Sequence, residues 1–318
     1  MSIPRNVARR RLVLLSVTLA IALVQLQALT ASQPSPPQSD DPTTLKVFVL
    51  LGQSNMQGKG KVEHLKELAG ADETRATYGH WLDAEGGWVA RDDVWIWFLD
   101  RRGPLTVGYG APAEDRFGPE LEIGRVLGEA FEEPVLLVKI AWGGKSLARD
   151  FRPPSSGGEV GSCYTETLEH VREVLATREA LFPELAAASH ELAGLFWFQG
   201  WNDRIDQAFN DEYEANLANL IRDLRAALEL PALPVVIGET GQGGPDETHP
   251  RALSLMRAQA AVAEREEFDG TVGFVGTRRF YDDEPQHDGG YHFFGNAENV
   301  LGIGAAMGEA MLELLDEG

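Results

Sequence analysis

Cysteine is almost absent from this 318-residue chain, which has only Cys163. A single cysteine excludes an internal disulfide and a zinc site built from several cysteines. We interpret Cys163, within GSCYTE, as a small buried residue rather than a nucleophile, because its neighbours lack catalytic character.

Basic residues are also scarce: 28 lysines and arginines stand against 49 acidic residues, for a formal net charge of -21. A surface of this sign repels phosphates, so we expect no nucleic acid and no anionic membrane as partner. It also disfavours a strongly acidic polysaccharide, unless a local basic pocket compensates.

The chain lacks an apolar run long enough to span a bilayer, which takes about 20 residues. The longest such run, at 12–26, follows four arginines and precedes small residues. This layout predicts a secretory signal peptide over residues 1–32, with an uncleaved membrane anchor as the alternative. We therefore expect a secreted or periplasmic protein that does not contact the membrane once the signal peptide is removed.

The rest of the chain divides into a linker and one domain. The sequence QPSPPQSDDPTT at 33–44 predicts an extended, Pro-rich linker. Residues 45–318 suit one large domain with a real core. The sequence does not indicate an oligomeric state.

Short apolar runs alternate with helical patterns along this domain. The runs, bounded by Gly or Pro and typical of buried strands, lie at 45–51, 134–141, 194–198, 234–238 and 271–275. The amphipathic helical patterns lie at 119–131, 164–179, 210–228, 250–266 and 297–315. The alternation predicts a three-layer α/β/α domain with a mainly parallel, five-stranded sheet. We interpret residues 59–110, which lack a clear period, as a long insertion that could wall a substrate site.

Chemistry in such sheets gathers at the carboxyl ends of the strands. The first predicted strand runs into LLGQSNMQG, which places Ser54 directly after a strand and a Gly. A serine nucleophile needs this exposure, a base within hydrogen-bond reach and donors for the oxyanion. The alternative is that Ser54 caps the next helix.

Two further motifs follow strands at the same edge. FWFQGWND places Gln199, Asn202 and Asp203 there, and Asn offers a neutral amide donor. IAWGGKSL places Gly143 and Gly144 there, where paired glycines can present backbone N–H groups. An Asx turn and an ordinary glycine turn are the structural alternatives.

A late histidine completes the set. His292, one of seven histidines, precedes the final helical pattern, on the loop after the last strand. From there a base can reach the end of the first strand. A lone histidine is more often structural, and it is Ser54 that favours a catalytic role for His292.

Together, GQSNM, the Gly–Gly pair, GWND and YHFFGNAE resemble the SGNH hydrolases, and within them the sialate O-acetylesterase-like branch, also called carbohydrate esterase family six. The resemblance spans essentially the whole domain. It implies a flavodoxin-like sheet, no cofactor, no metal, and ester hydrolysis through an acyl-enzyme.

The resemblance also assigns roles. Ser54 matches the nucleophile and His292 the general base. The oxyanion hole would use the N–H groups of Ser54 and of Gly143 or Gly144, and the amide of Asn202. Gln53, Gln199 and Trp142 are expected at the substrate mouth.

The acid of the triad departs from the family pattern, because many SGNH hydrolases carry it three residues before the histidine, where this chain has Gly289. Asp288 lies four residues before His292, and the Gly–Gly pair could fold the loop so that its carboxylate reaches Nδ1. Asp203, Asp283 and Glu239 are the other candidates. A backbone carbonyl in a Ser–His dyad is a further possibility.

The expected substrate is an acetylated carbohydrate, polysaccharide or sialate. Several tryptophans near the expected edge could stack on sugar rings or pack in the core: Trp81, Trp88, Trp95, Trp97 and Trp142. A general short-chain carboxylesterase and a noncatalytic carbohydrate-binding protein are the alternative functions.

Overall fold

The computed structural model describes residues 44–185 and 189–317. The predicted signal peptide and nearly all of the predicted linker lie outside the described residues. Thr44, the last residue assigned to that linker, already begins the first strand. Among the residues described, no helix is both long enough and apolar enough to cross a membrane.

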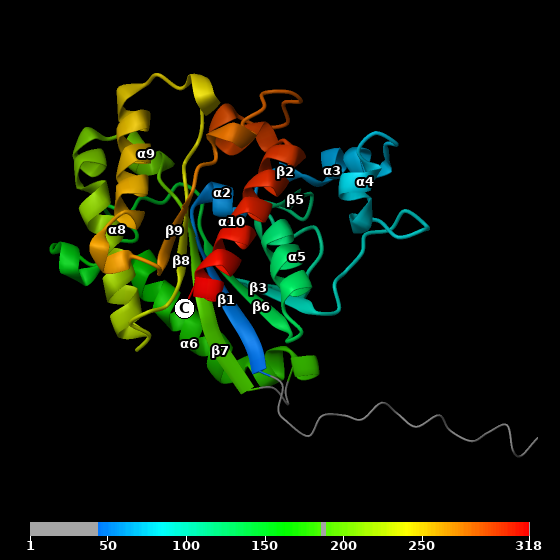
Figure 1. Ribbon diagram of the computed structural model, residues 1–318, viewed down its shortest axis with the longest axis horizontal. Coiled ribbons are helices and arrows are strands. Elements are labelled where there is room, and N and C mark those ends of the chain that lie inside the picture. The colour runs from blue at the N-terminus through cyan, green and yellow to red at the C-terminus, as the bar shows by residue number, and fades with distance from the viewer. Residues whose placement is uncertain (1–43, 186–188, 318) are drawn as a thin grey trace, which may run out of the picture. The chain divides into compact units, whose positions relative to one another are not determined.

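Seven strands form the central sheet, in the order β4-β3-β6-β1-β7-β8-β9 (Figure 1). They are β1 (Thr44–Gly52), β3 (Val94–Phe98), β4 (Arg101–Pro104), β6 (Val135–Ala141), β7 (Ser189–Phe198), β8 (Val235–Gly238) and β9 (Val272–Val275). Every pair is parallel except β3 with β4. A separate antiparallel pair joins β2 (Gly60–Lys61) to β5 (Arg116–Phe117).

The mainly parallel sheet is confirmed, and its five predicted strands follow the flavodoxin-like order 2-1-3-4-5. The predicted count of five is wrong, because β3 and β4 both lie within residues 59–110, the stretch interpreted as an insertion. The VWIWF segment of β3 is buried along its whole length and pairs with β6. This stretch is therefore partly sheet rather than a loop.

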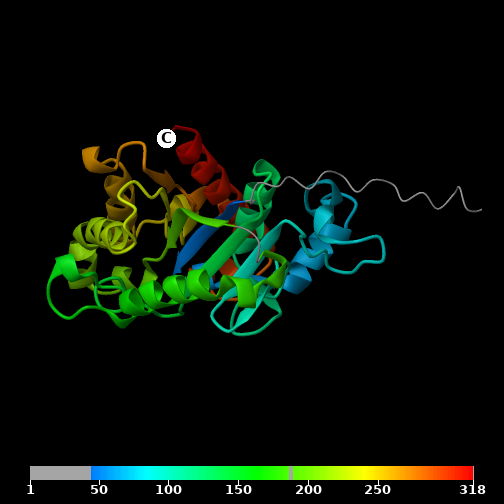
Figure 2. The ribbon, with the colours of Figure 1, turned by 90° about the horizontal axis from the view of Figure 1, so that it is seen from below.

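Helices cover both faces of the sheet, which gives the predicted three layers. One face packs against α6 (Ser162–Leu181), α8 (Gln207–Ala227) and α9 (Pro250–Ala263), and the other against α5 (Glu120–Ala130) and α10 (Ala297–Glu317). In Figure 2, α10 (red) and α6 (green) lie on opposite sides of the strands. Successive residues of β1 alternate between the two cores, as the period of a strand requires.

Shorter helices connect these elements. The α-helical ones are α2 (Ser54–Gln57), α3 (Val62–Gly70), α4 (Arg75–Tyr78) and α7 (Trp201–Arg204). The 3-10 turns are η2 (Gly79–Trp81), η3 (Pro154–Ser156), η4 (Pro183–Leu185), η5 (Gly244–Asp246), η6 (Glu266–Phe268), η7 (Arg278–Phe280) and η8 (Gly290–Gly295).

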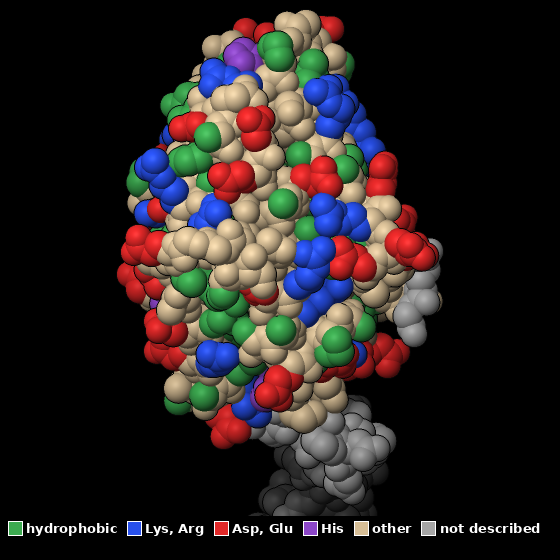
Figure 3. Space-filling view, turned by 90° about the vertical axis from the view of Figure 1, so that its left-hand side faces the viewer, with side chains coloured by type: hydrophobic (Ala, Val, Ile, Leu, Met, Phe, Trp, Pro, Cys, Tyr) green, Lys and Arg blue, Asp and Glu red, His purple; other side chains and the backbone are tan. Residues whose placement is uncertain are grey.

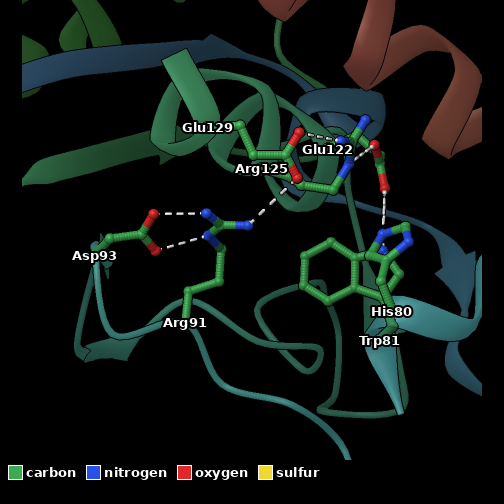
Figure 4. A network of polar contacts seen from close by, with 7 residues as sticks. All are labelled: His80, Trp81, Arg91, Asp93, Glu122, Arg125 and Glu129. Atoms are coloured by element: carbon green, nitrogen blue, oxygen red, sulfur yellow. Dashed lines mark hydrogen bonds and ion pairs between the residues drawn. The ribbon is translucent and has the colours of Figure 1, made fainter. Parts of the chain in front are cut away.

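A polar network attaches the segment before β3 to α5 (Figure 4). The buried carboxylate of Glu122 accepts hydrogen bonds from Trp81 Nε1 at 3.0 Å and Arg125 Nε at 2.6 Å, and His80 Nε2 lies 3.5 Å away. Burial opposes ionisation of Glu122, but the contacts from His80, Arg125 and Trp81 outweigh it and lower the pKa of the carboxyl. Arg91 pairs with Asp93 within the same segment, and its guanidinium lies 3.9 Å from the carboxylate of Glu129 in α5. These contacts fix the segment to α5.

A buried ion pair joins β6 to α5. Lys139 Nζ donates to Glu120 Oε2 at 2.8 Å and to the carbonyl of Tyr109 at 2.7 Å, and both charged side chains are 0% exposed. The ammonium also lies 4.5 Å from the ring centroid of Phe98. Burial lowers the pKa of Lys139 to about 8, against the pull of the Glu120 carboxylate. One cation therefore holds together β6, α5, β3 and the loop after β4.

Figure 3 presents one face of the molecule, coloured by side-chain type. Basic side chains there lie among acidic ones. The expectation from net charge that the protein binds no phosphate-rich partner stays a prediction.

Lys139→Met is expected to lower the free energy of unfolding by about 3–5 kcal/mol, because Glu120 is left buried without its counter-ion. The double variant Lys139→Met/Glu120→Leu should recover part of this loss, since it removes both charges. Urea denaturation measures both values. Lys46→Met is the matched control: it breaks the more exposed pair with Glu191 and should cost about 1 kcal/mol or less. Equal losses of unfolding free energy in Lys139→Met and in the double variant would contradict the claim that the unpaired Glu120 carboxylate causes the loss.

Candidate functional site

The predicted motifs lie on loops at the carboxyl ends of β1, β6 and β7 and on η8 before α10. In Figure 1 this edge is at the top of the sheet, where α2 follows β1. Ser54 is the first residue of α2, and its side chain is largely buried, at 7% exposure. It lies at a strand end, as the sequence predicts.

The turn before Ser54 requires glycine. A Cβ built on Gly52 would lie 2.2 Å from the carbonyl oxygen of Phe198, at the end of β7. The same carbonyl accepts the N–H of Gln53 at 3.2 Å, and the carbonyl of Gly52 accepts the N–H of Trp142 at 3.3 Å. The ends of β1, β6 and β7 are therefore in direct backbone contact.

Gln53 joins the serine loop to the loop after β7. Its Oε1 accepts the N–H groups of Gly200 and Asn202, and its Nε2 donates to Asn202 Oδ1 at 3.3 Å. The side chain is buried, and its amide is engaged with protein groups. Its predicted place at the mouth stays a prediction.

These contacts orient the amide of Asn202. Because Oδ1 accepts from Gln53, the Nδ2 group points the other way and donates to the carbonyl of Gly144 at 2.8 Å. Gly144 has φ +74°, a left-handed conformation that favours glycine. An amide nitrogen carries two hydrogens, so one remains for a ligand. The two predicted oxyanion elements, the Gly–Gly loop and Asn202, are thus in contact.

Asp203 joins the loop after β7 to the loop after β6. Its carboxylate is fully buried and accepts the N–H groups of Leu147 and Ala148, both at 2.8 Å, and Gln199 Nε2 at 2.6 Å. Burial raises the pKa of Asp203 to about 6, against these hydrogen bonds. Gln199 also donates to the carbonyl of Lys145. Gln199, predicted to bind substrate, is buried among protein groups, and that role stays a prediction.

His292 and Asp288 are in contact. Asp288 Oδ1 lies 3.1 Å from His292 Nδ1, which leaves Nε2 as the ring nitrogen for another partner. Burial lowers the pKa of His292; the Asp288 carboxylate opposes this, and Lys59 and Arg116 add to it. A lowered pKa keeps the imidazole neutral, and therefore able to accept a proton, at neutral pH.

Arg116 supports this pair from the other side. Its guanidinium lies 4.0 Å from the second carboxylate oxygen of Asp288 and donates to the carbonyl of Lys59 at 2.9 Å. Burial raises the pKa of Asp288, but the N–H of Gly289, His292 and Arg116 outweigh this and lower it. The carboxylate is thus held ionised beside the imidazole.

The backbone after His292 is strained. Phe293 and Phe294 have φ values of +51° and +56°, in the left-handed region that residues with a side chain rarely adopt. The buried ring of Phe293 packs against Phe198 and Tyr281, which holds the segment in place. Such strain gathers at functional sites because surrounding packing has to maintain it.

A hydrogen bond brings the serine and histidine loops together. Asn55 Nδ2 donates to the carbonyl of Tyr291 at 3.2 Å. Asn55 and Tyr291 are the chain neighbours of Ser54 and His292, so these two residues lie on adjoining loops.

The three other candidate acids do not contact His292 in any hydrogen bond or ion pair given for the described residues; the contacts of Asp203 are given above. Glu239 is buried and accepts hydrogen bonds from Thr277 and Arg278, beyond β9, and Asp283 is exposed. Cys163 is buried as expected, and burial raises the pKa of its thiol to about 11. Within the part of the chain that the structure describes, no group of three His, Cys, Asp or Glu side chains is arranged to hold a metal.

Of the five tryptophans that could stack on sugar rings or pack in the core, most are buried. Trp81, Trp95 and Trp97 are buried in the cores, and Trp142 is half-buried against Phe151 and His170. A groove of about 700 Å³ lies at the end of β3, with Trp88 and residues 100–102, 106–109 and 114 in its lining. Ser54 and His292 do not line it, so the role of this stretch as a substrate wall stays a prediction.

Sequence reasoning missed two aromatic residues inside its own motifs. Trp201, in GWND, packs against Tyr291, in GGYH, with ring centroids 5.5 Å apart and the planes tilted by 35°. The signal was available, since each ring is the chain neighbour of a candidate site residue, Asn202 or His292. Their contact depends on the fold, because 90 residues separate them.

The chain resembles proteins described as carbohydrate esterases. The sequence model of the family described as "carbohydrate esterase, sialic acid-specific acetylesterase" matches residues 44–313. A probable carbohydrate esterase of Arabidopsis thaliana is 24% identical over 202 residues, 63% of this chain and 70% of its own. Its solved structure superposes with a TM-score of 0.57 at 19% identity, covering 85% of this chain and 98% of that one.

A carbohydrate acetylesterase from Xanthomonas citri is also similar, with a TM-score of 0.46 at 15% identity, covering 72% of this chain and 49% of that one. At these identities, the likeness to the Arabidopsis structure shows the fold.

Asp203→Ala is expected to lower the free energy of unfolding by roughly 2–5 kcal/mol, because it leaves the buried N–H groups of Leu147 and Ala148 without acceptors. Urea denaturation measures the change. Asp150→Ala is the matched control: this carboxylate serves Ser146 and Lys145 in the same loop but is partly exposed, so water can replace it at about 1 kcal/mol. Equal losses in the two variants would contradict the proposed fastening by Asp203.

Proposed function

Since the chain belongs to the carbohydrate esterase family of sialic acid-specific acetylesterases, we propose that it is a serine esterase that removes O-acetyl groups from carbohydrate. Ser54 is the nucleophile, His292 the general base, and Asp288 the acid that orients the imidazole. The observation that carries the proposal is the contact of Asp288 with His292 Nδ1, on a loop bonded to the residue after Ser54.

The reaction has two steps. His292 Nε2 takes the proton of the Ser54 hydroxyl as its oxygen attacks the acetyl carbonyl carbon. The tetrahedral intermediate collapses, the C–O bond to the sugar breaks, and the imidazolium returns the proton to the leaving sugar oxygen. Water then repeats the sequence on the acetyl-serine and releases acetate. No cofactor is needed for this chemistry.

The oxyanion hole combines backbone and side-chain donors. The N–H of Ser54, the N–H of Gly143 or Gly144, and the second Nδ2 hydrogen of Asn202 bind the negative oxygen. Gln53 and Gly144 hold the Asn202 amide by both of its ends, so the donor needs no reorganisation during the reaction. The loops that carry these donors are fastened by Asp203.

The proposed substrate is an acetylated polysaccharide or sialate that meets the enzyme outside the cytoplasm. The family membership supports the carbohydrate. The basic, then apolar, then small-residue layout of residues 1–32 supports export.

Ser54→Ala is expected to abolish acetate release from acetylated carbohydrate, with a fall in kcat of roughly 10⁴-fold or more, because no nucleophile remains. A fluorophosphonate probe should label the native protein but not this variant. Ser155→Ala is the matched control: this serine bonds Asp223 away from the site and should leave rate and labelling unchanged.

The same assay separates the alternatives. A folded native protein that is neither labelled nor active would favour a noncatalytic carbohydrate-binding protein. Faster hydrolysis of an octanoyl than of an acetyl ester would favour a general carboxylesterase. Full activity in Ser54→Ala would contradict the role of Ser54 as nucleophile.

Asp288→Asn is expected to lower kcat/KM by roughly 10³- to 10⁴-fold, as loss of the orienting carboxylate does in serine hydrolases. The acidic limb of the pH profile should also move to lower pH. The Asp288 carboxylate raises the pKa of His292, so its removal lowers that pKa further, and the neutral base persists in more acidic solution. Steady-state kinetics across pH measure both effects.

Asp283→Asn is the control for this variant, because Asp283 is an exposed carboxylate of the same segment. Its rate and pH profile should match those of the native protein. An unshifted limb in Asp288→Asn, or a large loss in Asp283→Asn, would remove Asp288 from the proposed role.

A further inference from the structure

An exposed aromatic ring lies beside the proposed base. Tyr291 is 45% exposed, and with Val160 and Ile205 it makes up the exposed large apolar side chains among the residues that the structure describes. Its ring centroid is 4.3 Å from that of His292, with the two planes inclined by 63°. The contacts given above for the proposed chemistry use its backbone carbonyl but not its ring.

The ring is held in place from two sides. The carbonyl of Tyr291 accepts hydrogen bonds from Asn55 Nδ2 and from Gln242 Nε2, at 3.2 and 3.4 Å. The ring packs against Trp201 with the two planes tilted by 35°, and the guanidinium of Arg204 lies 4.2 Å from the Trp201 centroid. Tyr291 is therefore ordered before a ligand arrives, which reduces the entropy lost on binding.

The position of the base decides which half of an ester this ring meets. In the proposed reaction the imidazole returns its proton to the leaving alcohol, so that alcohol has to lie against His292. The acetyl oxygen lies instead toward the donors of Gly143, Gly144 and Asn202. A ring packed against the imidazole therefore faces the alcohol half.

We propose that Tyr291, backed by Trp201, is the subsite for the sugar ring that carries the acetyl group. The C–H face of a pyranose is apolar and flat enough to lie on an aromatic face, which the exposed part of Tyr291 provides. This inference rests on the proposed function and extends it, since it assigns recognition of the carbohydrate to a residue outside the catalytic set.

Two acetate esters with different alcohols test the subsite. A monoacetylated methyl glycoside and ethyl acetate form the same acetyl-serine, but only the glycoside brings a sugar ring. Nitrophenyl esters are avoided because their leaving group is itself an aromatic ring that could stack on Tyr291. Acetate release by the full chain gives kcat/KM for each ester.

Tyr291→Ala is expected to lower kcat/KM for the glycoside by roughly 10- to 30-fold, since one aromatic contact is lost, and to leave ethyl acetate within about twofold. Tyr291→Phe keeps the ring and should restore the glycoside rate. Val160→Ala, which trims a similarly exposed apolar side chain elsewhere, should change neither ester.

The outcomes separate the subsite from the function. Equal losses on both esters would mean that Tyr291 only positions His292, and no change on either would mean that the sugar does not touch it; each overturns the subsite. A native protein that hydrolyses neither ester would overturn the proposed function, and the subsite with it.

A second measurement, inhibition by the sugar product, tests binding of the sugar without requiring its ester to be hydrolysed. The deacetylated methyl glycoside should inhibit hydrolysis of ethyl acetate by occupying the alcohol side. Its inhibition constant should rise by roughly 10-fold in Tyr291→Ala and stay unchanged in Tyr291→Phe. Equal inhibition of the native protein and Tyr291→Ala would contradict stacking on this ring.

Discussion

The side-chain amide of Gln53 is the contact on which the functional edge depends. It satisfies two backbone N–H groups of the loop after β7 and fixes the direction of the Asn202 amide. The chain that follows Gln53 is the serine turn itself. One buried amide therefore sets the spacing between the proposed nucleophile and the proposed oxyanion donor, and the close approach of Gly52 to Phe198 leaves that spacing little freedom.

Two buried charged groups support this edge in different ways. Asp203 joins the loops after β6 and β7 by accepting backbone N–H groups that would otherwise lack partners. Lys139 joins strands, helix and loop further along the sheet through Glu120 and Tyr109. Both are costly to bury, and each is retained where irregular backbone has to be held in one conformation.

The sequence predicted what depends on local pattern and missed what depends on distant contacts. Apolar runs bounded by Gly or Pro predicted five strands. The loops that follow these strands were then the candidates for the site, because chemistry in parallel sheets gathers at strand ends. β3 was not predicted, because its run of aromatic and β-branched residues lies in a stretch without a clear hydrophobic period. The Asp288–His292 contact could be named only as one possibility, because it depends on how Gly289 and Gly290 fold. Tyr291 was passed over because its partner, Trp201, is remote in the chain.

The carboxylate and the imidazole of the proposed pair belong to one five-residue segment, closed on itself by the carbonyl of Gly289, which accepts the N–H groups of His292 and Phe294. Motion of this segment as a rigid body would carry both groups together. The serine lies on a different loop, so such motion would break the Asn55–Tyr291 hydrogen bond and lengthen the gap between the proposed nucleophile and the proposed base. In that displacement the proposed base would keep its carboxylate partner while losing its nucleophile.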